Sequence, residues 1–179
     1  MSRDNAVVID SPSVKNAVLA QIADKKGLVG DEPARLDATL RRVGFVESKN
    51  DPAAVQQSGG PGRGTYQHEL GESTKALQQR LENYEETYGY VPLTKEDRTA
   101  LKAGDMSKVS ADGQDALTLV GWVMKTPGDE VGELARGEYK TGQFWLDYHW
   151  AGDAKDAPKK KEQWMREMAD YQRMNGRTN

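Results

Sequence analysis

Residues 110–124, SADGQDALTLVGWVM, form the most hydrophobic stretch of this 179-residue chain. Leu117, Val120 and Met124 recur at the spacing of one helix face, so the stretch predicts an amphipathic helix. A Pro-Gly pair at 127–128 ends it. Because the apolar run is far too short to cross a bilayer, we expect a central core helix and no membrane insertion.

Similar patterns on both sides of this stretch predict further helices. Their expected positions are Ser11 to Lys26, Asp31 to Ser48, Ser73 to Tyr88, Thr94 onward, Asp129 to Tyr139, Gln143 to Trp150 and Pro158 onward. Residues 56–64, QQSGGPGRG, contain four glycines and a proline, which exclude a regular helix. The predicted fold class is therefore mostly α, with about seven helices and a short glycine-rich loop or β-hairpin.

Composition limits the core and the partners of the chain. Leucine, isoleucine, valine and phenylalanine together number 30, which predicts a lean core for one compact unit. The chain carries 25 basic and 28 acidic residues, and a net charge of -3 argues against a specific nucleic-acid partner. With no cysteine and two histidines, it lacks the ligands of a thiolate or three-histidine metal site, so we expect no metal and no cofactor.

The N-terminal residues are not expected to act as a signal peptide. Asp4 lies in the region that should be basic, and the apolar stretch Ala6 to Ile9 is too short. Another component would then have to deliver the chain to any site outside the cytoplasm.

Glu47 is the most informative single residue of the sequence. It lies four residues after Val43 and seven after Leu40, so on a helix it continues an apolar stripe. Partial burial there would raise the pKa of its carboxyl, which prepares a carboxylic acid to donate a proton near neutral pH. The alternative is an exposed glutamate at a fraying helix end, or one paired with a nearby arginine such as Arg41, Arg42 or Arg63.

The glycine-rich segment gives Glu47 a context. The pair Glu47-Ser48 ends a predicted helix, and after a polar loop the chain continues as Gly64-Thr65-Tyr66-Gln67. This combination resembles the lytic transglycosylase branch of the lysozyme-like superfamily, in particular the peptidoglycan-cleaving domains of tailed-phage virions. The resemblance covers mainly residues 36–69. The family's Gly-Leu-Met-Gln is replaced by Gly-Thr-Tyr-Gln, and the nearest counterpart of its later Tyr-Asn-x-Gly signature is His149-Trp150-Ala151-Gly152.

The resemblance implies a lysozyme-like catalytic domain at residues 31–155, between an N-terminal helical segment (1–30) and a C-terminal amphipathic helix with a tail (156–179). It also implies cleavage of the β-1,4 bond between MurNAc and GlcNAc, with Glu47 as the single acid and base. The muramic acid C6 hydroxyl would then be the nucleophile, so that no second carboxylate is required. If water attacks instead, Asp51 and Glu69 are the nearest carboxylates in the sequence to activate it.

The residues that would bind the glycan come from two parts of the sequence. The predicted set is Ser48, Gly64, Tyr66, Gln67, Trp145, His149 and Trp150. Ser48 corresponds to the family's helix-capping residue and Gln67 to its cleft glutamine. The aromatic side chains of residues 144–150 can stack on sugar faces, although aromatic stripes also form cores. Helical spacing predicts Trp145, Tyr148 and His149 on one face. Three roles for His149 stay open: sugar contact, orientation of Glu47, and structure.

The expected partners are peptidoglycan glycan strands and other phage virion proteins. The basic run Lys159 to Lys161 is a solvated helix face or an attachment point for an anionic partner. The chain would reside in the virion, or in the host cytoplasm before release, and act in the bacterial cell wall or periplasm when phage DNA enters. Two alternatives remain: a noncatalytic virion structural or ejection protein on a lysozyme-like scaffold, and a hydrolytic endolysin for host lysis.

Overall fold

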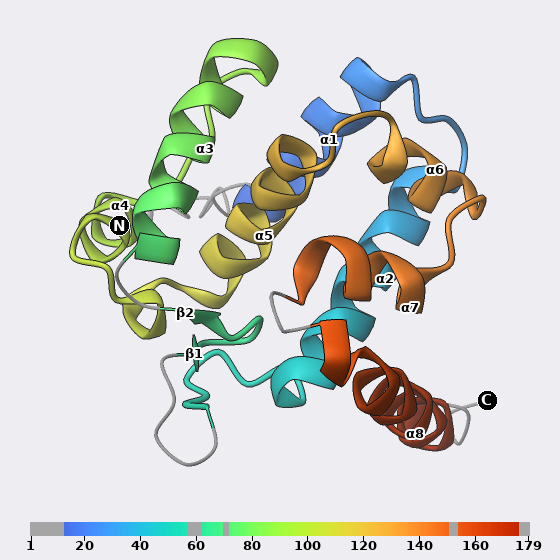
Figure 1. The fold of residues 1–179 in the computed structure, drawn as a ribbon. Helices are drawn as coiled ribbons and strands as arrows, with labels where there is room; N and C mark the ends of the chain where they lie inside the picture. Colours follow the sequence, from blue (N-terminus) through green and yellow to red (C-terminus); the bar gives the residue numbers. More distant parts are fainter. Residues whose placement is uncertain (1–12, 57–61, 70–71, 151–153, 176–179) are drawn as a thin grey trace, which may run out of the picture.

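A computed structural model of the chain describes residues 13–56, 62–69, 72–150 and 154–175 (Figure 1). These residues form eight α-helices and a small antiparallel hairpin. The helices are α1 (Val14–Lys26), α2 (Glu32–Ser48), α3 (Glu72–Tyr88), α4 (Lys95–Lys102), α5 (Ala111–Lys125), α6 (Glu130–Arg136), α7 (Thr141–Phe144) and α8 (Ala157–Asn175), and the strands are β1 (Gly62–Arg63) and β2 (His68–Glu69). The prediction of a mostly-α fold with about seven helices is confirmed. For the glycine-rich segment the prediction allowed a loop or a hairpin; residues 57–61 lie outside the described residues, and residues 62–69 form the hairpin.

Several of these helices begin at a serine or threonine whose side chain accepts a hydrogen bond from a backbone N–H of the first turn. The Ser110 hydroxyl accepts the backbone N–H of Gly113 at α5, and Thr94 accepts that of Asp97 at α4. At α1 the capping residue is Ser13, which accepts the N–H of Asn16. The predicted start of this helix at Ser11 lies outside the described residues. Gly27, with φ of 64°, closes α1 in the left-handed conformation that favours glycine.

Helix α5 is the centre of the core, as its sequence predicts. Nine of its fifteen residues are buried, and it lies between α3 on one side and α1 on the other (Figure 1). The buried residues of α1 belong to the same hydrophobic cluster as those of α2, α3, α5 and α6. The predicted boundary at residue 30 therefore falls between helices that share one core.

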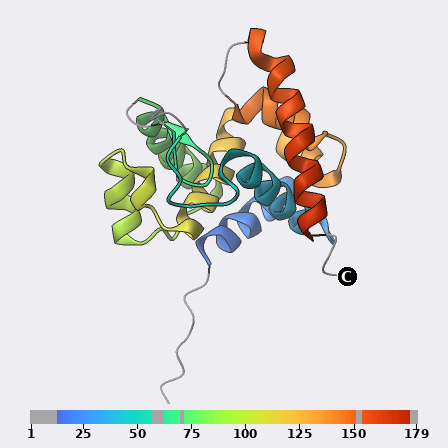
Figure 2. The same ribbon diagram turned by 90° about the horizontal axis from the view of Figure 1, so that it is seen from below.

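Helix α8 differs from the others because none of its described residues is fully buried. Figures 1 and 2 show it on the outside of the molecule, beside α2. Tyr171 of α8 packs edge-on against Phe45 of α2 with ring centroids 5.2 Å apart, and Glu167 forms an ion pair with Lys49 just beyond α2. Trp164 and Met168 pack against the margin of the core. Helix α8 is thus a peripheral layer over the end of α2.

The hairpin is joined to α5 by a buried glutamine. The Gln114 side-chain oxygen accepts the backbone N–H of Thr65 at 2.8 Å, and its amide donates to backbone carbonyls of the surrounding loops, including Met106 and Val109. Gly64 approaches so closely that a Cβ there would lie 2.4 Å from the same oxygen. These contacts set the hairpin beside α5 and the end of α2.

No helix in the described parts of the chain is both long enough and apolar enough to span a bilayer.

Candidate active site

Glu47 lies in the last turn of α2, on the same stripe as Leu40 and Val43, both of which are fully buried. Its side chain is 17% exposed, and its Oε1 accepts the indole N–H of Trp145 at 2.5 Å. The prediction that Glu47 is partly buried is confirmed. Among the described residues it forms no ion pair with an arginine, and Arg41 pairs with Asp37 instead.

Burial raises the pKa of the Glu47 carboxyl above its usual range. Two influences oppose this rise without cancelling it: the hydrogen bond from Trp145 and the positive charge of Lys160 on α8. The net effect increases the protonated fraction at a given pH. This is the state in which a carboxylic acid can act as a proton donor.

One oxygen of the Glu47 carboxyl, Oε1, has defined partners in the protein. Oε1 receives the Trp145 N–H, and the Nε2 atom of His149 lies 3.8 Å from the same oxygen. An indole N–H can only donate, so Oε1 serves as an acceptor and the acid proton is favoured on Oε2. The protein therefore holds the carboxyl by Oε1, which leaves Oε2 as the oxygen that carries the acid proton.

The hydrogen bonds of His149 define its protonation state. Its Nδ1 lies 3.1 Å from the indole nitrogen of Trp122, which can only donate, and its Nε2 lies 3.2 Å from the backbone carbonyl of Tyr66, which can only accept. His149 is therefore neutral and carries its proton on Nε2. Burial agrees with this assignment, because it lowers the pKa of His149 to about 3.

His149 points into the protein. Its side chain is 8% exposed, and its ring also faces the ring of His68 at a centroid distance of 6.3 Å. An enclosed ring does not favour the first of the three predicted roles for His149, direct contact with sugar. The structure fits the other two, which are orientation of Glu47 and a purely structural role.

The predicted glycan-binding residues of the hairpin are engaged within the protein. The Ser48 hydroxyl donates to the Thr65 carbonyl at 2.8 Å, which joins the end of α2 to the hairpin. Tyr66 is 3% exposed and donates its hydroxyl to Asp115 at 2.7 Å. Gln67, with φ of 50°, folds its side chain back to donate to the carbonyl of Gly64 at 2.9 Å. Neither the Tyr66 nor the Gln67 side chain is directed at Glu47 by these bonds.

The aromatic residues 144–150 divide differently from the helical prediction. Trp145–His149 form a π-helical turn, η3, closed by the bond from the Trp150 N–H to the Trp145 carbonyl. The wider turn changes which side chains share a face. Tyr148 packs with Phe144 at a centroid distance of 5.1 Å, although the prediction placed Phe144 on the other face. Trp150 is half-buried against the core.

Three residues that the sequence did not assign to the site complete it, although Lys160 belongs to the basic run noted in the sequence. Trp122 of α5 holds His149, Lys160 of α8 is the positive charge near Glu47, and Trp164 packs on Trp145 with ring centroids 5.3 Å apart. The role of Trp122 could have been inferred from the sequence in part, because a buried tryptophan on an apolar helix requires a hydrogen-bond acceptor for its N–H.

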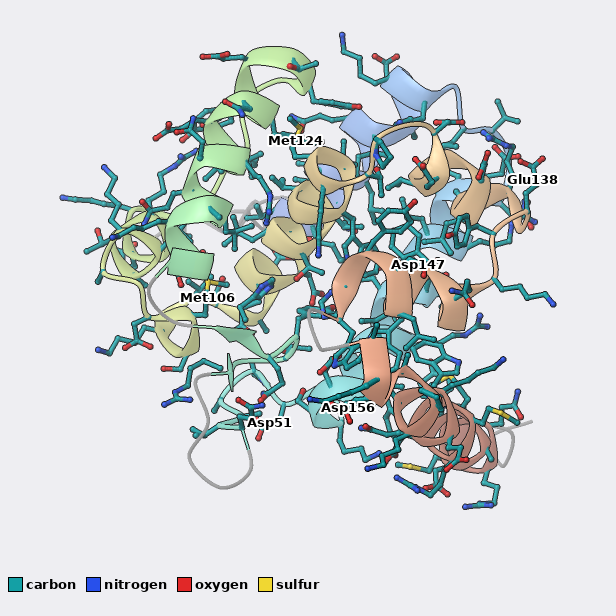
Figure 3. All side chains as sticks on the ribbon, viewed as in Figure 1. Asp51, Met106, Met124, Glu138, Asp147 and Asp156 are labelled. Carbon is teal, nitrogen blue, oxygen red and sulfur yellow. The ribbon has the colours of Figure 1, made fainter. Side chains whose placement is uncertain are left out.

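The two carboxylates predicted as candidates for activating water are Asp51 and Glu69. Asp51 lies on the loop between α2 and β1 (Figure 3), where its carboxylate accepts the backbone N–H of Ala53 at 2.9 Å. It is therefore part of a turn. Glu69 is in β2, and its side chain lies outside the described part of the structure. Within residues that are described, no group of three histidine, aspartate or glutamate side chains is arranged to hold a metal ion.

Two surface grooves formed by described residues lie near α8. The larger, about 650 Å³, lies between α2, α7 and α8 and includes Arg42, Lys140, Trp164 and Tyr171. The smaller, about 450 Å³, lies between α2 and α8 around Phe45 and Met174. Glu47 lines neither of them. Trp164 nevertheless connects the larger groove to the site, because it packs on the tryptophan that binds Glu47.

Comparison with known proteins gives no match, whether to protein families, to curated sequences or to solved structures.

Proposed function

We propose that this chain is a muramidase-like lytic transglycosylase that cleaves the β-1,4 bond between MurNAc and GlcNAc in peptidoglycan. The observation that carries the proposal is the state of Glu47: a carboxyl at the end of a buried helix, largely enclosed, bound through one oxygen by Trp145, and raised in pKa by burial. The resemblance of Glu47-Ser48 and Gly64 to Gln67 to the family's motifs supports the reaction class.

In the first step Glu47 acts as the acid. Its Oε2 proton passes to the glycosidic oxygen, the bond from that oxygen to the anomeric carbon of MurNAc breaks, and the GlcNAc side leaves as an alcohol. The carbohydrate left behind carries oxocarbenium character. The Glu47 carboxylate formed in this step is stabilised by the Trp145 N–H, which already points at Oε1.

In the second step Glu47 acts as the base. The C6 hydroxyl of the same MurNAc attacks its anomeric carbon and gives its proton to the Glu47 carboxylate. The product is a 1,6-anhydro sugar, and the carboxylic acid is regenerated. One carboxyl thus suffices for the full cycle.

The biological setting is proposed on the resemblance alone. In it the chain is a virion component of a tailed phage that opens the peptidoglycan layer when the genome enters the host. Its partners would be glycan strands and other virion proteins.

Clearing of purified peptidoglycan suspensions tests the activity. We expect the wild-type protein to clear them and Glu47→Gln to clear at least about 100-fold more slowly, because an amide cannot donate and retrieve the proton. Glu86→Gln is the matched control, since Glu86 is exposed on α3 and far in sequence from the site. Equal clearing by wild type and Glu47→Gln would show that Glu47 is not the acid.

A second candidate function is a noncatalytic virion structural or ejection protein that keeps the same scaffold. The observation that favours it is the position of the two surface grooves, because Glu47 lines neither. On this account the wild-type protein would bind peptidoglycan without releasing soluble sugars. A pull-down with insoluble peptidoglycan, followed by assay of the supernatant for sugar, separates the two functions.

A further inference from the structure

Four separate elements meet around His149. Trp122 comes from α5, His149 from η3, the Tyr66 carbonyl from the hairpin and Glu47 from the end of α2. The indole nitrogen of Trp122 lies 3.1 Å from Nδ1 of His149, and Nε2 lies 3.2 Å from the Tyr66 carbonyl and 3.8 Å from Oε1 of Glu47. The imidazole thus stands between a donor on one side and two oxygens on the other.

We propose that Trp122 is a positioning residue for Glu47, which it controls through the tautomer of His149. The inference rests on the proposed function, in which Glu47 is the acid and base. Because the indole N–H can only donate, it fixes Nδ1 as an acceptor and places the ring proton on Nε2. That proton faces the Tyr66 carbonyl and Oε1 of Glu47.

The opposite tautomer would have the opposite effect. An Nδ1–H would meet the Trp122 N–H, and the Nε2 lone pair would face the Tyr66 carbonyl oxygen and the Glu47 carboxyl. Such an arrangement opposes the negative charge that Glu47 acquires when it gives up its proton. With Nε2 protonated, the positive end of the N–H dipole lies 3.8 Å from the oxygen that Trp145 binds, which favours the carboxylate, while the Nε2–H itself donates to the Tyr66 carbonyl.

The other charged and titratable groups near His149 and Glu47 do not supply the hydrogen bond that Trp122 donates to Nδ1 of His149. Lys160 faces Glu47 from α8, and His68, from the hairpin, lies beside the His149 ring. Lys125, on α5, acts on His149 as a positive charge. Farther out, Arg80 of α3 acts on His68. Among these described groups none donates a hydrogen bond to Nδ1, so Trp122 is the donor that holds Nδ1 as an acceptor, while the Tyr66 carbonyl favours the proton on Nε2 from the other side.

The test uses NMR of the full-length protein and does not require activity. In ¹⁵N-histidine-labelled wild type we expect His149 to show an unprotonated Nδ1 and a protonated Nε2 from pH 5 to 8. In Trp122→Phe we expect a measurable fraction of the Nδ1-protonated tautomer, because the Tyr66 carbonyl alone then favours Nε2–H. A ¹³C-carboxyl titration should place the pKa of Glu47 higher in the variant by roughly 0.5 unit, comparable to part of one hydrogen bond.

The same variant has a kinetic signature. Because Glu47 must be protonated to act as the acid, activity on peptidoglycan falls as pH rises through its pKa. The alkaline limb of the pH-rate profile in Trp122→Phe should therefore shift to higher pH together with the Glu47 pKa. Simple loss of folded protein would instead lower the rate at every pH without a shift along the pH axis.

Two further proteins keep the test decisive. Trp164→Phe is the matched control, since Trp164 packs on Trp145 and forms no hydrogen bond or ring contact with His149 among the described residues, and it should retain the wild-type tautomer. Replacement of Trp122 by benzothienylalanine removes the N–H and keeps the ring shape, so it should reproduce the Trp122→Phe result even if phenylalanine disturbs packing.

An Nδ1-protonated His149 in wild type would overturn the inference, as would an unchanged tautomer and an unchanged Glu47 pKa in both Trp122 replacements. Failure of the proposed function is a separate outcome. It would appear as absence of activity in wild type while the NMR results stand.

Discussion

The Glu47 carboxyl is both enclosed from water and bound by few hydrogen bonds, an unusual combination for a carboxyl with a purely structural role. Its carboxyl is largely removed from water, which costs free energy in the charged form, yet the one hydrogen bond that it receives from the described residues is that of Trp145, at one oxygen. A structural carboxylate would be expected to have more hydrogen bonds or an arginine partner. The arrangement fits a group that must exist in both protonation states.

Trp145 should therefore control the acidity of Glu47 directly. In Trp145→Phe the carboxylate loses its hydrogen-bond donor, so the pKa of Glu47 should rise further, by about 1 unit, as expected for a hydrogen bond to a charged group. A ¹³C-carboxyl titration measures this. A Glu47 pKa that stays unchanged or falls in the variant would contradict the account of its environment.

At the scale of elements, the hairpin depends on a close approach to α5. Gly64 has φ of 76°, and a Cβ there would lie 2.4 Å from Oε1 of Gln114, whereas Gly137 has φ of 81° with nothing within 4 Å of the Cβ position. The two glycines share a backbone conformation and differ in surroundings. They therefore separate backbone strain from steric contact.

Alanine at these glycines should have unequal effects. Gly137→Ala should lower the free energy of unfolding by about 1 to 2 kcal/mol, the cost of a left-handed alanine. Gly64→Ala should lower it more, because the methyl group also displaces the Gln114 side chain from its backbone partners. Urea unfolding followed by circular dichroism gives both values, and equal losses would mean that the Gln114 contact is unimportant.

The elements also show what local sequence can predict. The spacing of Leu40, Val43 and Glu47 predicted both helix α2 and the partial burial of Glu47. It could do so because helical periodicity is visible in a short stretch of sequence. The contact between Gln114 and Thr65 joins residues 49 apart, and no periodic pattern encodes it. No periodic pattern encodes the π-helical turn at Trp145–His149 either, and Tyr148 packs with Phe144, which helical spacing placed on the other face.

At the scale of the whole molecule, two partly buried histidines make the free energy of unfolding depend on pH. Burial lowers the pKa of His68 to about 4 and of His149 to about 3, below the ordinary value of 6.5. The unfolded chain therefore binds more protons than the folded one below pH 6.5. The stabilisation due to these histidines is complete above that pH and is lost as pH falls toward their folded values. Glu47, with its raised pKa, acts in the opposite direction.

We therefore expect the free energy of unfolding to fall between pH 6.5 and pH 4. The slope should approach about 1.4 kcal/mol per pH unit for each histidine, partly offset by Glu47. Urea midpoints across this range measure it, and His68→Gln should reduce the slope. A midpoint that is constant or that rises on acidification would contradict the neutral, buried state of both imidazoles.

The central claim is that one carboxyl, Glu47, carries out both proton transfers of a transglycosylase. Mass spectrometry of the sugars released from purified peptidoglycan tests it most directly. We predict 1,6-anhydro-muramic products from the wild-type protein and none above background from Glu47→Gln. Products with reducing ends alone, or anhydro products released equally by the variant, would contradict the account.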